Sequence, residues 1–212
     1  MAGNTNIKTL LSKVKVSSND KIRIALIGSG IIGQDDTETA LKVPGVELMA
    51  VADLYQGRLD RAKEKWGNNL FVTRNYKEIL ARKDVDAVLV CVCDHWHDHI
   101  TIDALKAGKH VYCEKPMVHH VDEGLAVVAA QKTSGKVLQV GSQMASSVLF
   151  TEAQKYFKQG VVGDLTFAES YNDRNSSNGA WQYTIPSDAM PKTMDWDMFM
   201  GDAPKVPSDP VR

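Results

Sequence analysis

The sequence predicts an α/β fold with a doubly wound parallel sheet. Short apolar segments rich in β-branched residues alternate with segments of helical periodicity, and glycines separate many of them. Strands that alternate with helices at this spacing pair in parallel, and their crossover connections are right-handed. We place this domain at residues 20–143.

The expected elements follow one another in strict alternation. The strands cover residues 21–28, 46–53, 71–72, 87–93, 110–113 and 137–140. The helices cover residues 31–43, 59–66, 76–82, 100–107 and 121–134. The segment AVLVCVC at 87–93 is the most apolar, so we expect it at the centre of the sheet, where helices cover both faces. Pro44, Gly67 and Gly108 follow predicted helices as stop signals.

The residues after 143 differ from the first domain in composition and in the pattern of expected elements. A helix is expected at 150–159 and a strand at 165–171, followed by a polar stretch rich in proline, aspartate, methionine and tryptophan. One strand cannot form a stable sheet alone, because its backbone groups and its apolar face need partners. We therefore expect residues 144–212 to be the beginning of a second domain that is incomplete in this chain.

The composition argues against several classes of partner. Hydrophobic residues make up 43% of the chain and charged residues 24%, with a formal net charge of -1. These values are typical of a globular protein, and no basic excess favours nucleic acid or an anionic membrane. No segment approaches the roughly 20 apolar residues that a membrane helix needs. We expect neither nucleic acid nor a membrane as a partner.

The cysteines bear on the compartment. Cys91, Cys93 and Cys113 lie in apolar segments, so we expect them to be reduced and buried rather than paired in disulfides. The N-terminus lacks the apolar core of a signal peptide. Both observations favour the cytoplasm, with the periplasm as the alternative if a signal was removed before residue 1.

A glycine-rich loop follows the first expected strand. Gly28, Gly30 and Gly33 fit the pattern GxGxxG in the segment GSGIIG, between a strand and a helix. The first glycine permits a tight turn, the second lets a pyrophosphate approach the backbone, and the third allows helix and strand to pack closely. The start of the helix offers unpaired N–H groups and a positive dipole end to phosphates. The loop therefore predicts a Rossmann-type dinucleotide site.

Asp53 ends the second expected strand, 20 positions after Gly33. A carboxylate there accepts hydrogen bonds from the adenosine ribose and repels a 2′-phosphate, so NAD is the expected cofactor. Arg58 could partly accommodate a phosphate, which keeps NADP as the alternative. Structural glycines and a solvated aspartate are the competing interpretation, which the agreement of strand, spacing and acid disfavours.

Three alternating histidines follow the strand expected at 87–93. His95, His97 and His99 could suggest zinc, but a catalytic zinc site needs three convergent ligands and an open position. Side chains at a strand-to-helix turn need not converge. We therefore expect a polar loop that faces the cofactor, and no metal.

Lys115 follows the strand expected at 110–113 and lies next to Glu114. An ammonium group that is desolvated at a cofactor cleft is suited to acid–base work on a hydroxyl. A surface ion pair with Glu114 would instead contribute little. The residues alone leave both interpretations open.

Taken together, these segments resemble the glucose-fructose oxidoreductase / inositol dehydrogenase (Gfo/Idh/MocA) family. The resemblance covers residues 21–212 and rests on GSGIIG with Asp53, VLVCVCDHWHDHITIDALKAGKHVYCEKP, VLQVGSQ and DWDMFMGDAPKVP. It implies a Rossmann domain followed by an α+β domain with an open, mostly antiparallel sheet. It also implies a homo-oligomeric NAD(P)-dependent enzyme that acts on a hydroxyl of a sugar or polyol.

The resemblance also assigns roles to single residues. Asp94 and His97 would line the nicotinamide side, Glu114 would contact the nicotinamide ribose, and Lys115 would face the substrate hydroxyl as the catalytic residue. The full expected cofactor set is Gly28, Ser29, Gly30, Ile31, Ile32, Gly33, Asp53, Asp94, His97, Glu114, Gln143 and Trp181.

Two departures from the family pattern matter. Met144 and Ala145 stand where relatives often have basic residues, so a cofactor or substrate contact is expected to be missing. Family enzymes also draw a catalytic histidine, often with an aspartate, from a helix of the second domain. That segment would lie beyond Arg212.

Three functions follow from this reasoning. The leading one is hydride transfer between a nicotinamide cofactor and a hydroxyl of a sugar, polyol or related compound. A branch of the family resembles glycosidases that keep NAD bound and recycle it within one turnover, although the Glu-Lys-Pro segment at 114–116 fits dehydrogenases better. A non-catalytic dinucleotide-binding subunit is the third, and only the missing second-domain residues support it.

Overall fold

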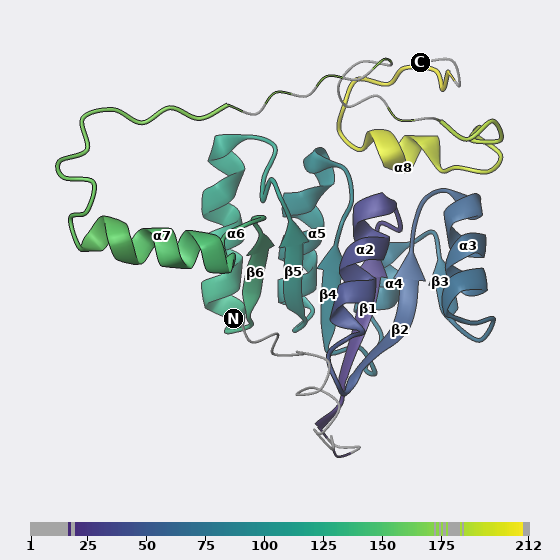
Figure 1. The fold of residues 1–212 in the computed structure, drawn as a ribbon. Coiled ribbons are helices and arrows are strands. Elements are labelled where there is room, and N and C mark those ends of the chain that lie inside the picture. The colour runs from purple at the N-terminus through teal and green to yellow at the C-terminus, as the bar shows by residue number, and fades with distance from the viewer. Residues whose placement is uncertain are drawn as a thin grey trace.

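A six-stranded parallel sheet, in the order β3-β2-β1-β4-β5-β6, forms the centre of the molecule (Figure 1). The computed structural model describes residues 17, 20–171, 173, 175, 177, 183 and 185–209. The strands are β1 (Ile22–Ile27), β2 (Val46–Ala52), β3 (Phe71–Thr73), β4 (Ala87–Val90), β5 (His110–Glu114) and β6 (Leu138–Gly141). This architecture confirms the predicted doubly wound sheet.

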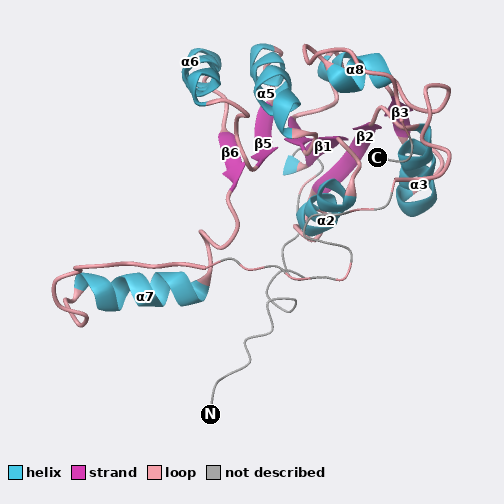
Figure 2. Cartoon of the chain, turned by 90° about the horizontal axis from the view of Figure 1, so that it is seen from above, coloured by secondary structure: helices cyan, strands magenta, loops and turns pink. Residues whose placement is uncertain are grey.

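Helices cover both faces of this sheet. The helices are α2 (Ile31–Ala40), α3 (Gln56–Trp66), α4 (Tyr76–Leu80), α5 (His97–Lys106), α6 (Gly124–Ser134), α7 (Val148–Lys158) and α8 (Trp196–Met200), with the short 3-10 turns η2 (Asp94–Trp96) and η3 (Val121–Glu123). Figure 2 shows α2 and α3 on one side of the sheet and α5 and α6 on the other. Within the described residues, no helix combines the length and the apolar character needed to cross a bilayer.

Two apolar clusters hold these layers together. Leu26, Val51 and Leu59 are buried on the face that α2 and α3 cover. Val88 and Leu105 are buried in the cluster on the opposite face. Burial on both faces explains why the central strands read as continuous apolar segments.

The strand expected at 87–93 is shorter than predicted, because β4 ends at Val90. Its last residues leave the sheet and lead into η2. Cys113 is buried and Cys91 is partly buried, but Cys93 is exposed. The expectation that all three cysteines are buried is therefore wrong for Cys93, which lies beyond the carboxyl end of the strand.

The chain after β6 departs from the predicted pattern. All residues of α7 are exposed, and Figure 2 shows this helix apart from the sheet. Residues 165–171 are exposed and form no strand, so the predicted strand is wrong. No described strand pairs with them, and an extended segment without a partner has no ladder of hydrogen bonds to hold it. The antiparallel sheet of a second domain stays a prediction.

Residues 188–201, which we call the return segment, come back to the carboxyl edge of the sheet. They include the short helix α8, which the sequence analysis did not predict (Figure 1). The Asp195 side chain caps α8 by accepting a hydrogen bond of 3.0 Å from the backbone N of Met198.

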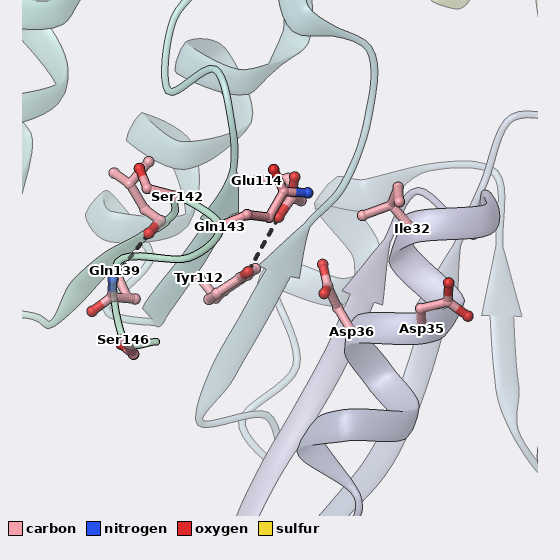
Figure 3. Close-up of a pocket in the computed structure, with 11 residues that line it drawn as sticks. Ile32, Asp35, Asp36, Tyr112, Glu114, Gln139, Ser142, Gln143 and Ser146 are labelled. Atoms are coloured by element: carbon pink, nitrogen blue, oxygen red, sulfur yellow. Dashed lines mark hydrogen bonds between the residues drawn. The ribbon is translucent and has the colours of Figure 1, made fainter. Parts of the chain in front are cut away.

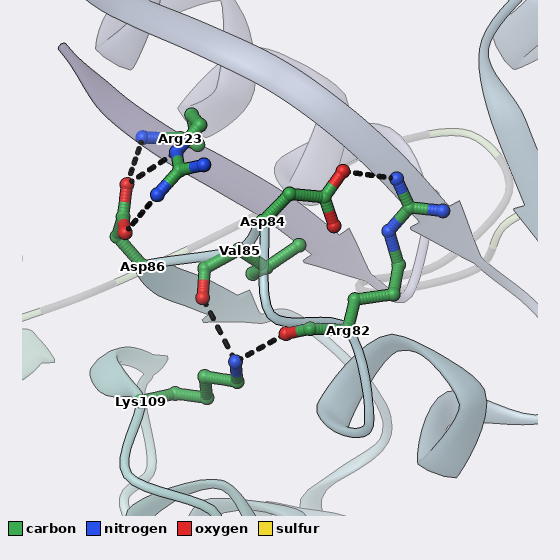
Figure 4. Close-up of polar contacts among 6 residues, drawn as sticks. All are labelled: Arg23, Arg82, Asp84, Val85, Asp86 and Lys109. Carbon is green, nitrogen blue, oxygen red and sulfur yellow. Dashed lines mark hydrogen bonds and ion pairs between the residues drawn. The ribbon is translucent and has the colours of Figure 1, made fainter.

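Charged residues at the amino edge of the sheet bind one another (Figure 4). Asp86 accepts hydrogen bonds from the Arg23 backbone N at 2.8 Å, from Nε at 3.0 Å and from Nη2 at 2.9 Å. Lys109, only 7% exposed, donates from Nζ to the carbonyl oxygens of Arg82 at 2.5 Å and Val85 at 2.9 Å. These contacts close the end of the sheet opposite the expected cofactor site.

Candidate functional site

The glycine loop joins β1 to α2 at the carboxyl edge. Gly28 has a φ of 95°, and a Cβ there would lie 2.2 Å from the carbonyl oxygen of Cys91. A Cβ on Gly33 would lie 2.1 Å from the carbonyl oxygen of Gly28. Both positions therefore require glycine, one for the tight turn and one for close packing of helix on strand.

Gly30 leaves an open space instead. The nearest atoms to a Cβ there would be those of the Arg58 guanidinium, at 3.9 to 4.0 Å. Gly30 is also the N-cap of α2, and no side chain caps this helix end. The first N–H groups of a helix have no acceptor within the helix, so a diphosphate fits against them.

Ser29 adds a second sign that the loop fits a ligand with acceptor oxygens. Its side chain is fully buried, and its Oγ has no hydrogen-bond partner among the described residues. A buried hydroxyl without a partner costs free energy, which a ligand oxygen at the loop can recover.

Asp53 connects this loop to the loop after β2. The residue is 8% exposed, and its Oδ2 accepts from the Ser29 N at 2.8 Å while its Oδ1 accepts from the Tyr55 N at 2.9 Å. Arg58 Nη1 lies 3.5 Å from Oδ2, and the Arg58 side chain is 50% exposed. A carboxylate has about four acceptor positions, so Asp53 can hold both loops and still accept from a ribose hydroxyl.

A cavity of about 320 Å³ lies next to the loop, between α2 and the ends of β5 and β6 (Figure 3). Three residues of the expected cofactor set line it: Ile32 from α2, Glu114 from β5, and Gln143 after β6. The fold thus brings together residues that lie more than 100 positions apart in the sequence.

The same cavity holds Asp36 and Tyr112, which the sequence analysis missed. Asp36 follows Ile32 by four positions on α2, and Tyr112 precedes Glu114 by two in β5, so each pair shares a face of its element. The spacing from Ile32 and from Glu114 could therefore have predicted that Asp36 and Tyr112 line the cavity.

The electrostatics of the cavity follow from its carboxyl groups. Glu114 is 5% exposed and accepts from the Tyr112 hydroxyl at 3.2 Å. Burial, and then the charge of Glu114, raise the pKa of Asp36 above its usual range. Burial, with the charges of Asp36 and Glu114, also raises the pKa of Tyr112. A Cβ on Gly141 would lie 2.3 Å from Glu114 Oε1, so this glycine makes room for the buried carboxylate.

Lys115 lies directly beyond β5 and is exposed. Its backbone N donates to Glu114 Oε2 at 3.2 Å. Among the described residues its ammonium group forms no ion pair with Glu114, so the surface ion pair that the sequence left open is not formed. The ammonium is therefore available to a ligand.

The three histidines after β4 turn to different partners. His95 Nε2 lies 2.8 Å from the carbonyl oxygen of Phe199, and His99 Nδ1 lies 2.8 Å from Asp98 Oδ1. His97 is 1% exposed, with Nδ1 at 2.5 Å from the carbonyl oxygen of Pro116. In the described part of the chain, no three potential metal ligands gather.

The expectation that His97 lines the nicotinamide side stays a prediction. Its Nε2 also lies 3.1 Å from the carbonyl oxygen of Val92, so the ring joins the loop after β4 to the turn after Lys115. Asp94, which begins η2 beside it, is exposed at the carboxyl edge. Trp181 lies outside the described residues.

Comparison with known proteins agrees with this geometry. Residues 22–142 match the model of the Gfo/Idh/MocA oxidoreductase family, which describes an NAD-binding Rossmann fold. Inositol 2-dehydrogenase/D-chiro-inositol 3-dehydrogenase from Shouchella clausii is 32% identical over 145 residues, which are 68% of this chain and 42% of the relative. A glycosyl hydrolase family 109 protein from Shewanella baltica is 30% identical over 168 residues, covering 71% of this chain and 35% of the relative.

A solved structure is similar over the same part of the chain. The WlbA dehydrogenase from Chromobacterium violaceum, in complex with NADH and UDP-GlcNAcA, has a TM-score of 0.63 at 28% identity, covering 68% of this chain and 41% of that chain. The chain spans less than half the length of these relatives.

Proposed function

The chain belongs to the Gfo/Idh/MocA family of oxidoreductases, whose Rossmann fold binds NAD, and from this premise we propose that it carries the cofactor half of a sugar or polyol dehydrogenase. The protein would bind NAD, with NADP as the alternative, and oxidise a CH–OH group of its substrate. When bound, the nicotinamide ring accepts the hydride. The protein's own residues would bind, orient and handle the proton.

The open end of α2 carries this proposal. Gly30 leaves room against a helix start that no side chain caps, and Arg58 puts a positive charge beside it. Asp53 holds the neighbouring loop and keeps acceptor capacity for a ribose. Backbone donors, a cation and a carboxylate in this order suit a diphosphate followed by a sugar.

The proton is assigned to Lys115. This exposed residue lies directly beyond β5 and follows Glu114, which lines the cavity. A substrate hydroxyl that donates to the neutral amine of Lys115 passes its proton to that amine more easily as the hydride leaves, and in the reverse direction the ammonium would polarise the carbonyl. Asp94 and Gln143 are proposed to border the nicotinamide. Proximity within one edge of the sheet then supplies the orientation that hydride transfer needs.

The substrate class and the assembly belong to the same proposal. The name of the Shouchella relative supports a polyol. The free cysteines support a reducing compartment such as the cytoplasm, and the exposed apolar residues of α7, including Phe150 and Phe157, support a packing partner for this helix. We propose a second domain from residue 144 onward and assembly as a homo-oligomer.

A glycosidase that recycles its NAD is the second candidate, because one relative is a glycosyl hydrolase family 109 protein. Product analysis on the full-length protein separates the two. Inositols, free sugars and aryl glycosides are incubated with NAD, while absorbance at the NADH wavelength and the released aglycone are followed. A dehydrogenase gives NADH in proportion to oxidised polyol. Cleavage of glycosides without net NADH would refute simple dehydrogenation.

A further inference from the structure

The segment DWDMFMG at 195–201 has no role in the site described so far. It forms α8 and the end of the return segment, which lies over the carboxyl edge beside α5 (Figures 1 and 2). Its contacts with the sheet edge concentrate on loops that follow two strands.

The first loop is the one after β2. The backbone N of Gln56 donates to the Thr193 carbonyl oxygen at 2.9 Å, and the Asp195 N donates to the Leu54 carbonyl oxygen at 3.1 Å. Tyr55 and Met194 form an antiparallel bridge between these two bonds. The return segment therefore pairs with the three residues that directly follow Asp53.

Tyr55 carries this contact to the ribose carboxylate. Its hydroxyl donates to Asp188 Oδ1 at 2.5 Å, and its backbone N donates to Asp53 Oδ1 at 2.9 Å. The hydrogen bond to Asp188 raises the pKa of Tyr55 to about 12. One residue thus links the return segment to Asp53.

The second loop is the one after β4. The Phe199 carbonyl oxygen lies 2.8 Å from His95 Nε2 and accepts from Trp96 Nε1 at 3.2 Å. A Cβ on Gly201 would lie 3.1 Å from the Trp96 ring, so the indole packs against the end of α8. These contacts fix the residues that directly follow Asp94.

The order of strands in the sheet shows which part of the carboxyl edge the return segment covers. Strand β1 lies between β2 and β4, so a segment bound to the loops after β2 and β4 spans the end of β1, where the glycine loop begins. In a dinucleotide-binding sheet, the adenosine half occupies the crevice between those loops. Both walls of that crevice are therefore held by residues 188–201.

We propose that the return segment is the outer wall of the adenosine subsite, where it positions Asp53 and sets affinity for the adenosine half of the dinucleotide. This rests on the proposed function. Ordering the two loops before the ligand arrives lowers the free-energy cost of binding. Tyr55, Trp96 and Asp188 act as positioning residues through their hydrogen bonds. A variant that removes such a bond should weaken binding, and a variant that retains it should not.

The test uses the full-length protein and the double variant Tyr55→Phe/Trp96→Phe, which removes two donors, keeps the ring of residue 55 and replaces the indole of residue 96 with a phenyl ring. Loss of two hydrogen bonds predicts about tenfold weaker binding of NAD. ADP-ribose, which lacks nicotinamide, should weaken by the same factor. The KM for NAD should rise while kcat stays unchanged, a split that a general loss of structure would not give. Trp66→Phe and Tyr156→Phe are the matched controls.

A second pair of variants keeps the test decisive if the double variant folds poorly. Asp188→Ala should weaken ADP-ribose binding, and Asp188→Glu, which retains an acceptor, should restore part of it. If the wild-type protein binds ADP-ribose and all variants bind it equally well, this inference is overturned and the proposed function stands. If the wild-type protein binds neither NAD nor ADP-ribose, both are overturned.

Discussion

Polar side chains at the amino edge of the sheet have partners within the fold, whereas key polar side chains at the carboxyl edge have none among the described residues. At the amino edge, Asp86 is bound by Arg23, and the Lys109 ammonium is bound by two carbonyl oxygens (Figure 4). At the carboxyl edge, Lys115 is exposed, and the Ser29 hydroxyl is buried without a partner in the described structure.

This difference separates stability from function. A charge whose partners belong to the same fold stabilises that fold, whereas a donor without an internal partner costs free energy until a ligand arrives. Variants at the two edges should therefore have opposite signatures, with stability lost at one edge and binding or turnover lost at the other.

The largest expected effect is that of Lys115→Ala. Removing a group that moves the substrate proton typically costs 10² to 10⁴ in rate, so turnover should fall by about three orders of magnitude. NAD affinity should stay within about twofold, because Lys115 is proposed to face the substrate rather than the cofactor. Steady-state kinetics and calorimetry of the full-length protein measure both. Loss of NAD binding in this variant would contradict the assigned role.

Gly33→Ala should have the next largest effect, on folding. The added Cβ would lie 2.1 Å from the carbonyl oxygen of Gly28, and neither backbone can move without disturbing β1 or α2. We expect a loss of about 3 kcal/mol or more in the free energy of unfolding, measured by urea denaturation. Gly124→Ala is the control, because its φ is -58° and an added Cβ would come no closer than 3.9 Å to Met117 Cε. An unchanged midpoint for Gly33→Ala would refute the close packing.

Lys109→Met tests the amino edge. The variant leaves the carbonyl oxygens of Arg82 and Val85 without the donor that Lys109 Nζ supplies. Hydrogen bonds to charged groups contribute about 1.5 to 3 kcal/mol, so we expect a destabilisation of about 2 kcal/mol. NAD affinity of the folded protein should not change. If Lys109→Met lowered NAD affinity and left the free energy of unfolding unchanged, the proposed separation between a stabilising amino edge and a ligand-binding carboxyl edge would be wrong.

The smallest expected effect is that of Asp86→Asn. The hydrogen bond from Arg23 lowers the pKa of Asp86, so this carboxylate stabilises the fold above its unfolded pKa and loses that contribution as the pH falls. Both side chains of the pair are more than one third exposed, at 39% and 35%, so solvent screening keeps the effect on stability small. Unfolding curves between about pH 6 and pH 3 should show a shallower decline for the variant. An identical slope would mean that solvent screens the pair completely.

The sequence was most informative where local pattern decides structure. The glycine loop, the place of Asp53 at the end of the second strand and the alternation of strands with helices follow from spacing and from apolar segments, and the structure reproduces them. Cys93 escaped prediction because the apolar run at 87–93 continues past the end of β4. The strand predicted at 165–171 failed because a strand depends on a partner that β-propensity cannot supply.

Long-range contacts were beyond sequence reasoning. Tyr55 donates a hydrogen bond to Asp188, which lies 133 positions later, and neither local sequence predicts that the two residues meet. His97 looked like a polar residue of an open loop, but its ring is buried by a turn 19 positions later. In both cases the folded sheet edge brings the partners together.

The central claim is that a diphosphate lies against Gly30 at the start of α2. Calorimetric titration of NAD into wild-type protein and Gly30→Ala tests it most directly, because the added methyl meets only the Arg58 side chain and should leave folding intact. We predict one NAD bound per chain in the wild type and at least about tenfold weaker binding in Gly30→Ala, with equal unfolding midpoints. Equal affinity in the two proteins would contradict the claim. So would a wild type that takes up neither NAD nor NADP and holds no nucleotide from purification.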